Sequence, residues 1–331
     1  MPLPPSDNAQ EVTDRHLETF PVEVTPTIHT ETIYQNSFAY FEFPNPQGAQ
    51  IIRHTFRAKV PELRWDLDLQ KVQAVTAWPE AFLPYLEQHA TLSQNTKFQR
   101  VLQQIVPQPG NPARDLTAVM AWVGEHMTYD HSQASLRADA AHAFRQQRGH
   151  CSDYHGLCAT MGRALGQPAR VTYGLNLFPK SSPSHCKLEL FLAPYGWVSF
   201  DVSETQKLLA KIEQSSETPE RKNSLKKAAL RRFTSGFRDN AWLLVTRGTN
   251  YDLAPKASQK VPVVRTIYAE ADGAALPEPD PANPHERTFA WMTAHRFTPN
   301  KKPRQAFQDF TTLSEWEVQP SSTPNRAKEL P

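Results

Sequence analysis

Three residues whose side chains together can make a sulfur nucleophile occur in order along the chain: Cys151, His185 and Asp201. A thiol attacks as the thiolate, so its pKa must be lowered, and a nearby imidazole must take up and return the proton. A carboxylate must then hold that imidazole in the productive tautomer. We therefore predict a Cys-His-Asp triad with Cys151 as nucleophile, His185 as base and Asp201 as the orienting acid.

The predicted position of Cys151 in the chain supports this chemistry. Residues 151–166 repeat apolar side chains on one stripe, which predicts a helix, and Gly166 is a typical C-terminal stop. Cys151 is thus the first residue of the helix, where partial positive charge and free N–H groups stabilise a thiolate and an oxyanion. Gly149 lets the chain turn into the helix without a side chain that would block substrate.

His185 and Asp201 fall on two predicted strands, residues 185–192 and 197–202, that are close enough to form a hairpin. A regular four-residue loop over 193–196 would place the two side chains on opposite faces, because a one-residue slip reverses every side chain. The triad therefore predicts a bulge or an odd-numbered loop between residues 192 and 201. Asp201 would then lie opposite Lys187 or Glu189.

The rest of the chain predicts a mixed architecture. Residues 1–18 look polar and flexible, and 19–75 contain strand-like runs separated by Pro and Gly. Residues 76–205 change to a helical period and then to the strands of the triad, which marks a catalytic core. Residues 206–331 predict a helical linker over 203–232 and a β-containing extension, with strand-like runs AWLLVTRGTNYDL and VPVVRTIYAEADG.

Composition excludes several classes of protein. The chain has 331 residues, 39% of them hydrophobic, which is enough for a substantial core. A formal net charge of +2 gives no general attraction to nucleic acid or membrane, and the basic run Arg221–Arg232 fits a solvated helix face better than a binding site. The first twenty residues lack the features of a secretory signal, so a cytoplasmic location is expected.

The residues around the triad resemble a known family. The run RGHCSDYHGLCATMGRALGQPARVTYG, the run HCKLELFLAPYGWVSFD and the MTYD at 127–130 are similar, in order, to motifs of the transglutaminase-like superfamily. The resemblance covers about 112–202. It implies an α+β fold with a papain-like core, in which the Cys helix packs on an antiparallel sheet. It also implies that Cys151, His185 and Asp201 carry acyl transfer or hydrolysis through an acyl-enzyme, without a cofactor, on a peptide or protein substrate.

Two positions depart from the family pattern. Lys187 stands where an aromatic residue is common, and Asp201 is followed by Val202-Ser203 rather than Pro-Thr. We expect neither to touch the triad, although Lys187 could alter the rim of the substrate site. The side chain that assists the oxyanion stays open among Tyr129, Trp122 and Gln147.

Other interpretations of the same residues compete with the triad. Asp201 could simply cap the segment that follows it. Cys158 and Cys186 are expected to be core residues, His155 has no assigned role, and Glu189 is expected to hydrogen-bond near His185.

At the level of function, Cys151, His155 and Cys158 could bind zinc, with Cys186 or His185 as a further ligand. A non-catalytic binding module that kept the fold is a second alternative. Arylamine acetyl transfer and glycopeptide amide cleavage are narrower ones. No EF-hand-like acidic loop indicates calcium.

Overall fold

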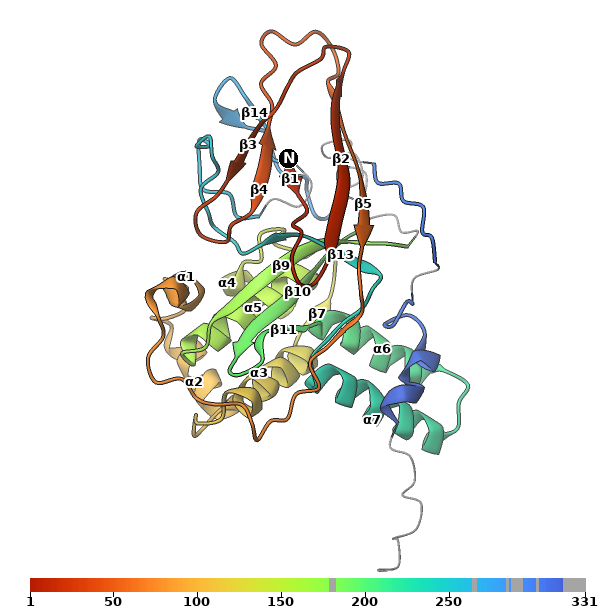
Figure 1. Ribbon diagram of the computed structural model, residues 1–331. Coiled ribbons are helices and arrows are strands. Elements are labelled where there is room, and N and C mark those ends of the chain that lie inside the picture. The colour runs from red at the N-terminus through yellow and green to blue at the C-terminus, as the bar shows by residue number, and fades with distance from the viewer. Residues whose placement is uncertain (179–182, 264–266, 284–285, 287–293, 302–303, 318–331) are drawn as a thin grey trace, which may run out of the picture.

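An antiparallel sheet of four strands, in the order β11-β10-β9-β13, forms the centre of the computed structural model (Figure 1). The structure describes residues 1–178, 183–263, 267–283, 286, 294–301 and 304–317. The central strands are β9 (Ala169–Asn176), β10 (Ser184–Leu192), β11 (Gly196–Phe200) and β13 (Trp242–Arg247). The predicted α+β class is confirmed, since helices of the same chain pack on this sheet.

The hairpin of β10 and β11 has an odd loop, as the triad requires. Leu192 pairs with Gly196 and Leu188 pairs with Phe200, so only residues 193–195 form the loop. Continuing this register by one residue places Asp201 opposite Lys187, on the face of the sheet that His185 shares. The predicted irregularity between residues 192 and 201 is therefore confirmed as a three-residue connection rather than a bulge.

Helix α5 (Cys151–Ala164) packs along β9 and β10, behind the sheet in Figure 1. Every residue from Cys151 to Gly162 is buried. Gly149 enters the helix with φ +152°, and a Cβ there would lie 2.4 Å from an Asp153 carboxylate oxygen. Asp153 in turn accepts a hydrogen bond from the His150 backbone N–H at 3.0 Å. The tight turn that the sequence predicted before Cys151 is thus closed by a glycine and an N-terminal acid.

Further helices surround α5 and fix its position. They are α1 (Leu83–Leu86), which continues a 3₁₀ turn at Glu80–Phe82, and α2 (Thr96–Ile105), α3 (Pro112–His126) and α4 (Ala140–Gln146). The last of these, α4, begins at Ala140. Leu136 and Ala138 have positive φ, and the Asp139 side chain caps the helix by accepting from the N–H groups of Ala141 and His142. Short strands β7 (Thr128–Tyr129) and β8 (Arg148–Gly149) pair in parallel beside it.

The N-terminal residues are ordered, which differs from the flexible segment predicted for 1–18. Strand β1 (Pro2–Leu3) pairs with β4 (Ser37–Tyr40), which also pairs with β3 (Thr27–Thr30). Strand β2 (Glu11–Phe20) and β5 (Ile51–Lys59) form a ribbon that rises away from the central sheet (Figure 1).

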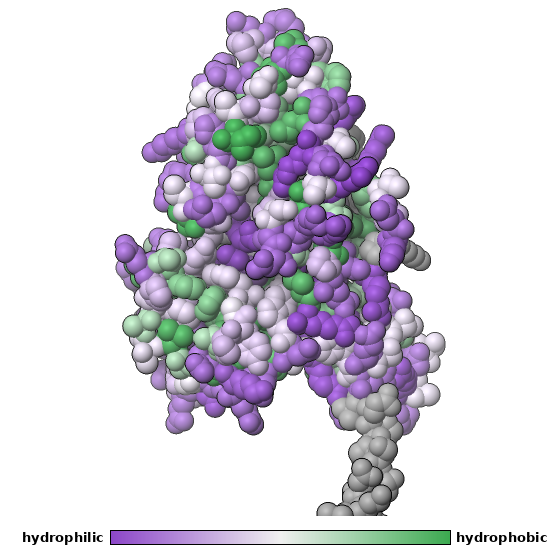
Figure 2. Space-filling model, in the orientation of Figure 1, coloured by the Kyte–Doolittle hydropathy of each residue, from purple (hydrophilic) through white to green (hydrophobic). Residues whose placement is uncertain are grey.

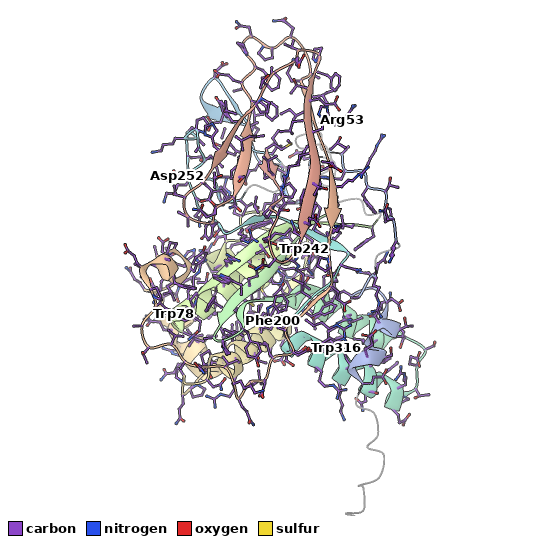
Figure 3. All side chains as sticks on the ribbon, viewed as in Figure 1. Arg53, Trp78, Phe200, Trp242, Asp252 and Trp316 are labelled. Carbon is purple, nitrogen blue, oxygen red and sulfur yellow. The ribbon has the colours of Figure 1, made fainter. Side chains whose placement is uncertain are left out.

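Long-range hydrogen bonds explain this order. The amino group of Met1 donates to the carbonyl of Ala39, and the buried Gln10 side chain exchanges hydrogen bonds with the backbone of Leu244. Polar composition suggested a loose end, but these partners lie far away in the sequence. Trp242, labelled in Figure 3, lies where this N-terminal region meets the central sheet.

The C-terminal part begins with the predicted helical segment, which is two helices, α6 (Val202–Gln214) and α7 (Pro219–Thr234). Thr218 caps α7, and Pro219 follows at its first position. The 3₁₀ helix η3 (Phe310–Trp316) packs on this pair through Leu313. Strand β12 (Phe237–Arg238) pairs with β6 (Leu63–Arg64), tying the region to the N-terminal segment.

Strand-like runs beyond α7 are only partly strands. The first is β13, which ends at Arg247 because Gly248 turns with φ +79°. Of the second, at 261–273, residues 264–266 lie outside the described residues, and the remainder contributes β14 (Glu270–Ala271), paired with β15 (Ala274–Ala275).

Apolar side chains are visible between polar ones over the N-terminal strands in Figure 2. The exposed large apolar residues of that region are Phe20, Val22, Ile28, Tyr40 and Ile51. In the part of the chain that the structure describes, no helix has the length and apolar content needed to cross a bilayer.

Candidate active site

The three residues singled out in the sequence meet at the start of α5. His185 Nε2 lies 2.7 Å from Asp201 Oδ2, and the Cys151 sulfur lies close enough to His185 to raise the pKa of that imidazole. Because Nε2 faces the carboxylate, Nδ1 is the ring nitrogen left to exchange a proton with the thiol. Cys151, His185 and Asp201 are 7%, 3% and 1% exposed. A Cys-His-Asp array is therefore present, and it is buried.

Both carboxylate oxygens of Asp201 accept hydrogen bonds, one at the start of α6 and one from His185. Oδ1 caps α6 by accepting from the Glu204 backbone N–H at 3.0 Å and from the Ser203 hydroxyl at 3.2 Å. Oδ2 accepts from His185. The sequence left capping and orientation of His185 as alternatives for Asp201, but one carboxylate makes both contacts. Capping also fixes the direction in which Oδ2 points.

The thiol of Cys151 has the electrostatic surroundings of a thiolate. The Cys186 side chain donates a hydrogen bond to it, and the positive charge and hydrogen bond of His185 add to this effect. Together they hold the pKa of Cys151 well below its usual range, although burial alone would raise it. The imidazole responds in the opposite sense. Burial lowers the pKa of His185, but the charges of Asp201 and Cys151 outweigh it and raise that pKa to about 9.

A second histidine completes a chain of hydrogen bonds behind the thiol. The Val202 backbone N–H donates to His155 Nε2 at 3.1 Å, so the neutral ring carries its proton on Nδ1. His155 Nδ1 lies 3.6 Å from the sulfur of Cys186. The Cys186 side chain, which is not disulfide-bonded, is in turn the main influence that lowers the pKa of Cys151. Burial lowers the pKa of His155 to about 4, so it stays neutral. Sequence reasoning treated Cys186 as core and gave His155 no role; their contact with each other, behind Cys151, needed the packing of α5 on β10.

Lys187 contradicts its expected place on the rim of the substrate site. Its side chain is 1% exposed, and its Nζ lies 2.7 Å from Asp201 Oδ2 and 3.1 Å from Asp239 Oδ2. The odd hairpin loop is the reason, because it places Lys187 directly opposite Asp201. The residue that departs from the family pattern therefore does touch the triad.

For the oxyanion side chain, the structure places Tyr129 beside the turn that leads into α5. Strand β7 pairs Tyr129 with Gly149, two residues before the thiol. Burial and then the charge of Cys151 raise the pKa of Tyr129, so its hydroxyl keeps its proton. Trp122 instead stacks on His126 with ring centroids 4.3 Å apart, and Gln147 is an exposed residue at the end of α4.

The C-terminal segment covers the His185 side of the array. Residues 305–308 and His185 line the same small cavity together with Lys187 and Glu204. Gln308 Nε2 donates to Glu204 Oε2 at 3.2 Å, and the Lys187 ammonium lies 4.9 Å from the centre of the Phe307 ring. The buried Arg232 guanidinium holds the segment by donating to the carbonyl of Ala306. The extension thus contributes part of the wall around the triad.

The zinc hypothesis on Cys151, His155 and Cys158 is wrong for the arrangement observed. Within the described ranges, no group of three or more His, Cys, Asp or Glu side chains is placed to hold a metal ion. The lone pair of His155 Nε2 already accepts the Val202 N–H, and burial raises the pKa of Cys158, which disfavours the thiolate a metal needs.

Glu189 makes a local hydrogen bond, as expected, and its partner is an arginine. Its carboxylate pairs with the buried Arg170, 2.7 Å away, on the neighbouring strand β9.

Residues 99–202 match the model of the transglutaminase-like superfamily. This segment is a transglutaminase-like core. It runs from within α2 to the first residue of α6 and contains Cys151, His185 and Asp201. The resemblance of the sequence motifs to this superfamily is confirmed, and so is the papain-like α+β core with its Cys helix on an antiparallel sheet.

Comparison with whole proteins gives more distant likenesses. An uncharacterised protein of Haemophilus influenzae is 22% identical over 205 residues, which cover 54% of this chain and 54% of that protein. The chain thus matches about half the length of this curated relative.

Among solved structures, the chain is similar to a proposed cysteine protease from Cytophaga hutchinsonii, with a TM-score of 0.49, 15% identity and coverage of 74% of this chain and 73% of that one. It is also similar to the periplasmic domain of TgpA from Pseudomonas aeruginosa, with a TM-score of 0.33, 16% identity and coverage of 60% and 66%.

Proposed function

We propose that this chain is a thiol enzyme that cleaves or transfers the acyl group of a peptide or protein amide through an acyl-enzyme on Cys151. The observation that carries the proposal is the convergence of Cys151, His185 and Asp201 at the N-terminus of α5, with His185 hydrogen-bonded to Asp201 and its charge lowering the pKa of Cys151. The sulfur, the imidazole and the carboxylate occur here in the order that acyl transfer requires, with the imidazole between the other two groups.

The first half of the reaction forms a thioester. The Cys151 thiolate attacks the amide carbonyl carbon, and the carbonyl π electrons move onto oxygen. The backbone N–H groups at the start of α5 and the Tyr129 hydroxyl are the donors proposed to stabilise this oxyanion. When the oxyanion collapses, the C–N bond breaks, and protonated His185 gives its proton to the leaving amine. The products of this half are the free amine and the acyl-Cys151 thioester.

The second half returns the enzyme to its starting state. Neutral His185 takes a proton from water or from an acceptor amine, which attacks the thioester carbon. The C–S bond then breaks, and the sulfur leaves as the thiolate beside the imidazolium. Water gives hydrolysis and an amine gives transfer, so both outcomes share every step carried by this chain's residues. Asp201 stays ionised throughout, because the charges of Lys187 and His185 hold its pKa well below the usual range despite burial.

The test begins without a substrate. Iodoacetamide near neutral pH is expected to alkylate Cys151 selectively in the folded protein, leaving Cys158 and Cys186 unmodified, with peptide mass spectrometry as the readout. Equally slow alkylation of all three cysteines would overturn the proposal and favour a non-catalytic binding module. Incubation with a library of peptide amides and esters should then give a mass adduct on Cys151, and its disappearance with water or with added amine separates hydrolysis from transfer.

A further inference from the structure

A buried lysine, Lys187, forms an ion pair with the carboxylate that contacts His185. Lys187 Nζ and His185 Nε2 each lie 2.7 Å from the same oxygen, Asp201 Oδ2. The second partner of the lysine is Asp239, 3.1 Å away on the segment after β12. In a triad of the usual kind the carboxylate faces its imidazole without a competing cation on the same oxygen. Here its negative charge is divided between two cations.

This arrangement is costly, so packing alone does not explain it. Removing an ammonium from water costs several kcal/mol, and an apolar side chain of similar volume often serves the core at least as well. The charges of Asp201 and Asp239 raise the pKa of Lys187 against the effect of burial, so the lysine remains charged. Its ammonium also lies 5.4 Å and 4.9 Å from the ring centres of Trp242 and Phe307.

The charged groups around the pair come from several elements. Helix α5 contributes Cys151 and the neutral His155, and α6 contributes Glu204, whose charge acts on both His185 and Asp201. Further groups are Tyr129, across from β8, and Asp239, with which the charges of Arg232 on α7 and Arg238 on β12 interact. Lys187 is the permanent cation in direct contact with the Asp201 carboxylate. Its removal would therefore change the field at His185 more than removal of any group that does not touch the triad.

We propose that Lys187 is a positioning residue that sets the proton affinity of His185 by sharing Asp201 Oδ2. By drawing on the same lone pairs, the ammonium limits how strongly Asp201 stabilises the imidazolium, so that protonated His185 can still release its proton to the leaving amine. At the same time it fixes Oδ2 in the direction of Nε2. The inference rests on the proposed thiol chemistry and deepens it, because Lys187 itself touches no reacting atom.

The sign of the effect follows from Coulomb's law. Loss of the ammonium leaves the full Asp201 charge on the imidazolium, so the pKa of His185 rises. Loss of the Asp239 charge has the opposite effect, because the lysine is then held by Asp201 alone and neutralises it more completely. Lys187→Met and Asp239→Asn should therefore shift the titration of His185 in opposite directions, which a role in packing alone would not produce.

The experiment follows the His185 ring by ¹⁵N NMR as a function of pH, together with the pH dependence of Cys151 alkylation by iodoacetamide. Relative to wild type, Lys187→Met should move the His185 titration upward by at least about half a pH unit, and Asp239→Asn should move it downward. Lys226→Met is the matched control, because it removes a lysine whose carboxylate partner, Glu213, lies on the surface. Its titration should overlay that of wild type.

Two outcomes separate this inference from the proposed function. If wild-type Cys151 alkylates like an ordinary thiol, the proposed function fails. If wild-type Cys151 is activated but the Lys187→Met and Asp239→Asn titrations overlay it, only the role of Lys187 fails. Should Lys187→Met not fold because Asp239 loses its partner, Lys187→Met/Asp239→Asn removes both charges and is still expected to titrate above wild type. An unshifted double variant overturns the inference in the same way.

Discussion

Two turns of one helix, α5, place chemically identical side chains in opposite electrostatic situations. Cys151 at the first turn and Cys158 two turns deeper are 7% and 1% exposed, so both are buried. Burial raises the pKa of Cys158, whereas the hydrogen bond from Cys186 and the charge of His185 hold the pKa of Cys151 well below its usual range. Exposure therefore does not explain why the two pKa values move in opposite directions; the donors and cations around each sulfur do.

The same contrast holds for the histidines around Asp201. His185 and His155 both approach its carboxylate, at 2.7 Å from Oδ2 and 3.6 Å from Oδ1. His185 donates to that carboxylate and its pKa is raised to about 9, while His155 accepts a backbone N–H and burial lowers its pKa to about 4. One imidazole is arranged to carry a proton charge and the other to remain neutral.

Replacing each cysteine by alanine should give the largest difference between Cys151 and Cys158. Cys151→Ala should abolish formation of the acyl adduct and leave folding intact, because alanine fits the first turn of the helix. Cys158→Ala should keep the adduct and instead lower the thermal midpoint, since it removes a buried sulfur from the core. Adduct mass and thermal unfolding, measured on both variants, check this. An adduct retained by Cys151→Ala would contradict the assignment.

Removing the imidazole should make Cys151 resemble Cys158. In His185→Ala the thiol loses the cation and the proton acceptor, so turnover should fall on the order of 10⁴-fold. Alkylation of Cys151 at neutral pH should slow in parallel, because its pKa rises. Steady-state turnover of the substrate found in the library, and alkylation rates, provide the measurement. His155→Gln is the matched variant and should lose far less, because His155 does not exchange a proton with the thiol.

Asp201→Asn should have a smaller effect, on the order of 10²-fold in turnover. Asparagine can still cap α6 through its side-chain oxygen, but it no longer stabilises the imidazolium. The pH dependence of Cys151 alkylation shows in which direction the pKa of His185 moves. In wild type His185 stays protonated up to a pKa of about 9, so the thiolate–imidazolium pair persists to that pH. In the variant the upper limb of the alkylation profile should move to lower pH, and an unmoved limb would exclude Asp201 as the orienting acid.

Changes at Cys186 should have the weakest effect on Cys151, and they test whether its side chain lowers the pKa of the Cys151 thiol. Cys186→Ala removes the donor to the Cys151 sulfur and should raise the pKa of Cys151 by about one unit, since a hydrogen bond to a charged group contributes roughly 1.5–3 kcal/mol. The acid limb of the alkylation profile would then move to higher pH. Cys186→Ser keeps an O–H donor and should restore the wild-type limb. If the acid limb of the alkylation profile lies at the same pH in wild type and in both variants, Cys186 only fills space.

Much of the site could be predicted because its information is local. Cys151 begins a helix after a glycine, and the parity of the hairpin loop determines whether Asp201 and His185 share a face. These are short-range properties of neighbouring residues, so the helix, the hairpin and the odd loop could all be argued from spacing. The motifs around them predicted the α+β core for the same reason.

The order and spacing of Cys151, His185 and Asp201 could be read from the sequence, and they are enough to predict the proposed chemistry. Which groups surround these three residues depends on how distant segments pack together. Lys187 faces Asp239, Cys186 reaches Cys151 and the first ten residues pair with distant strands through contacts between segments far apart in the chain. Electrostatic effects fall off over a few ångströms in space, whatever the separation in sequence, so the proton affinities of this site are properties of the packed molecule.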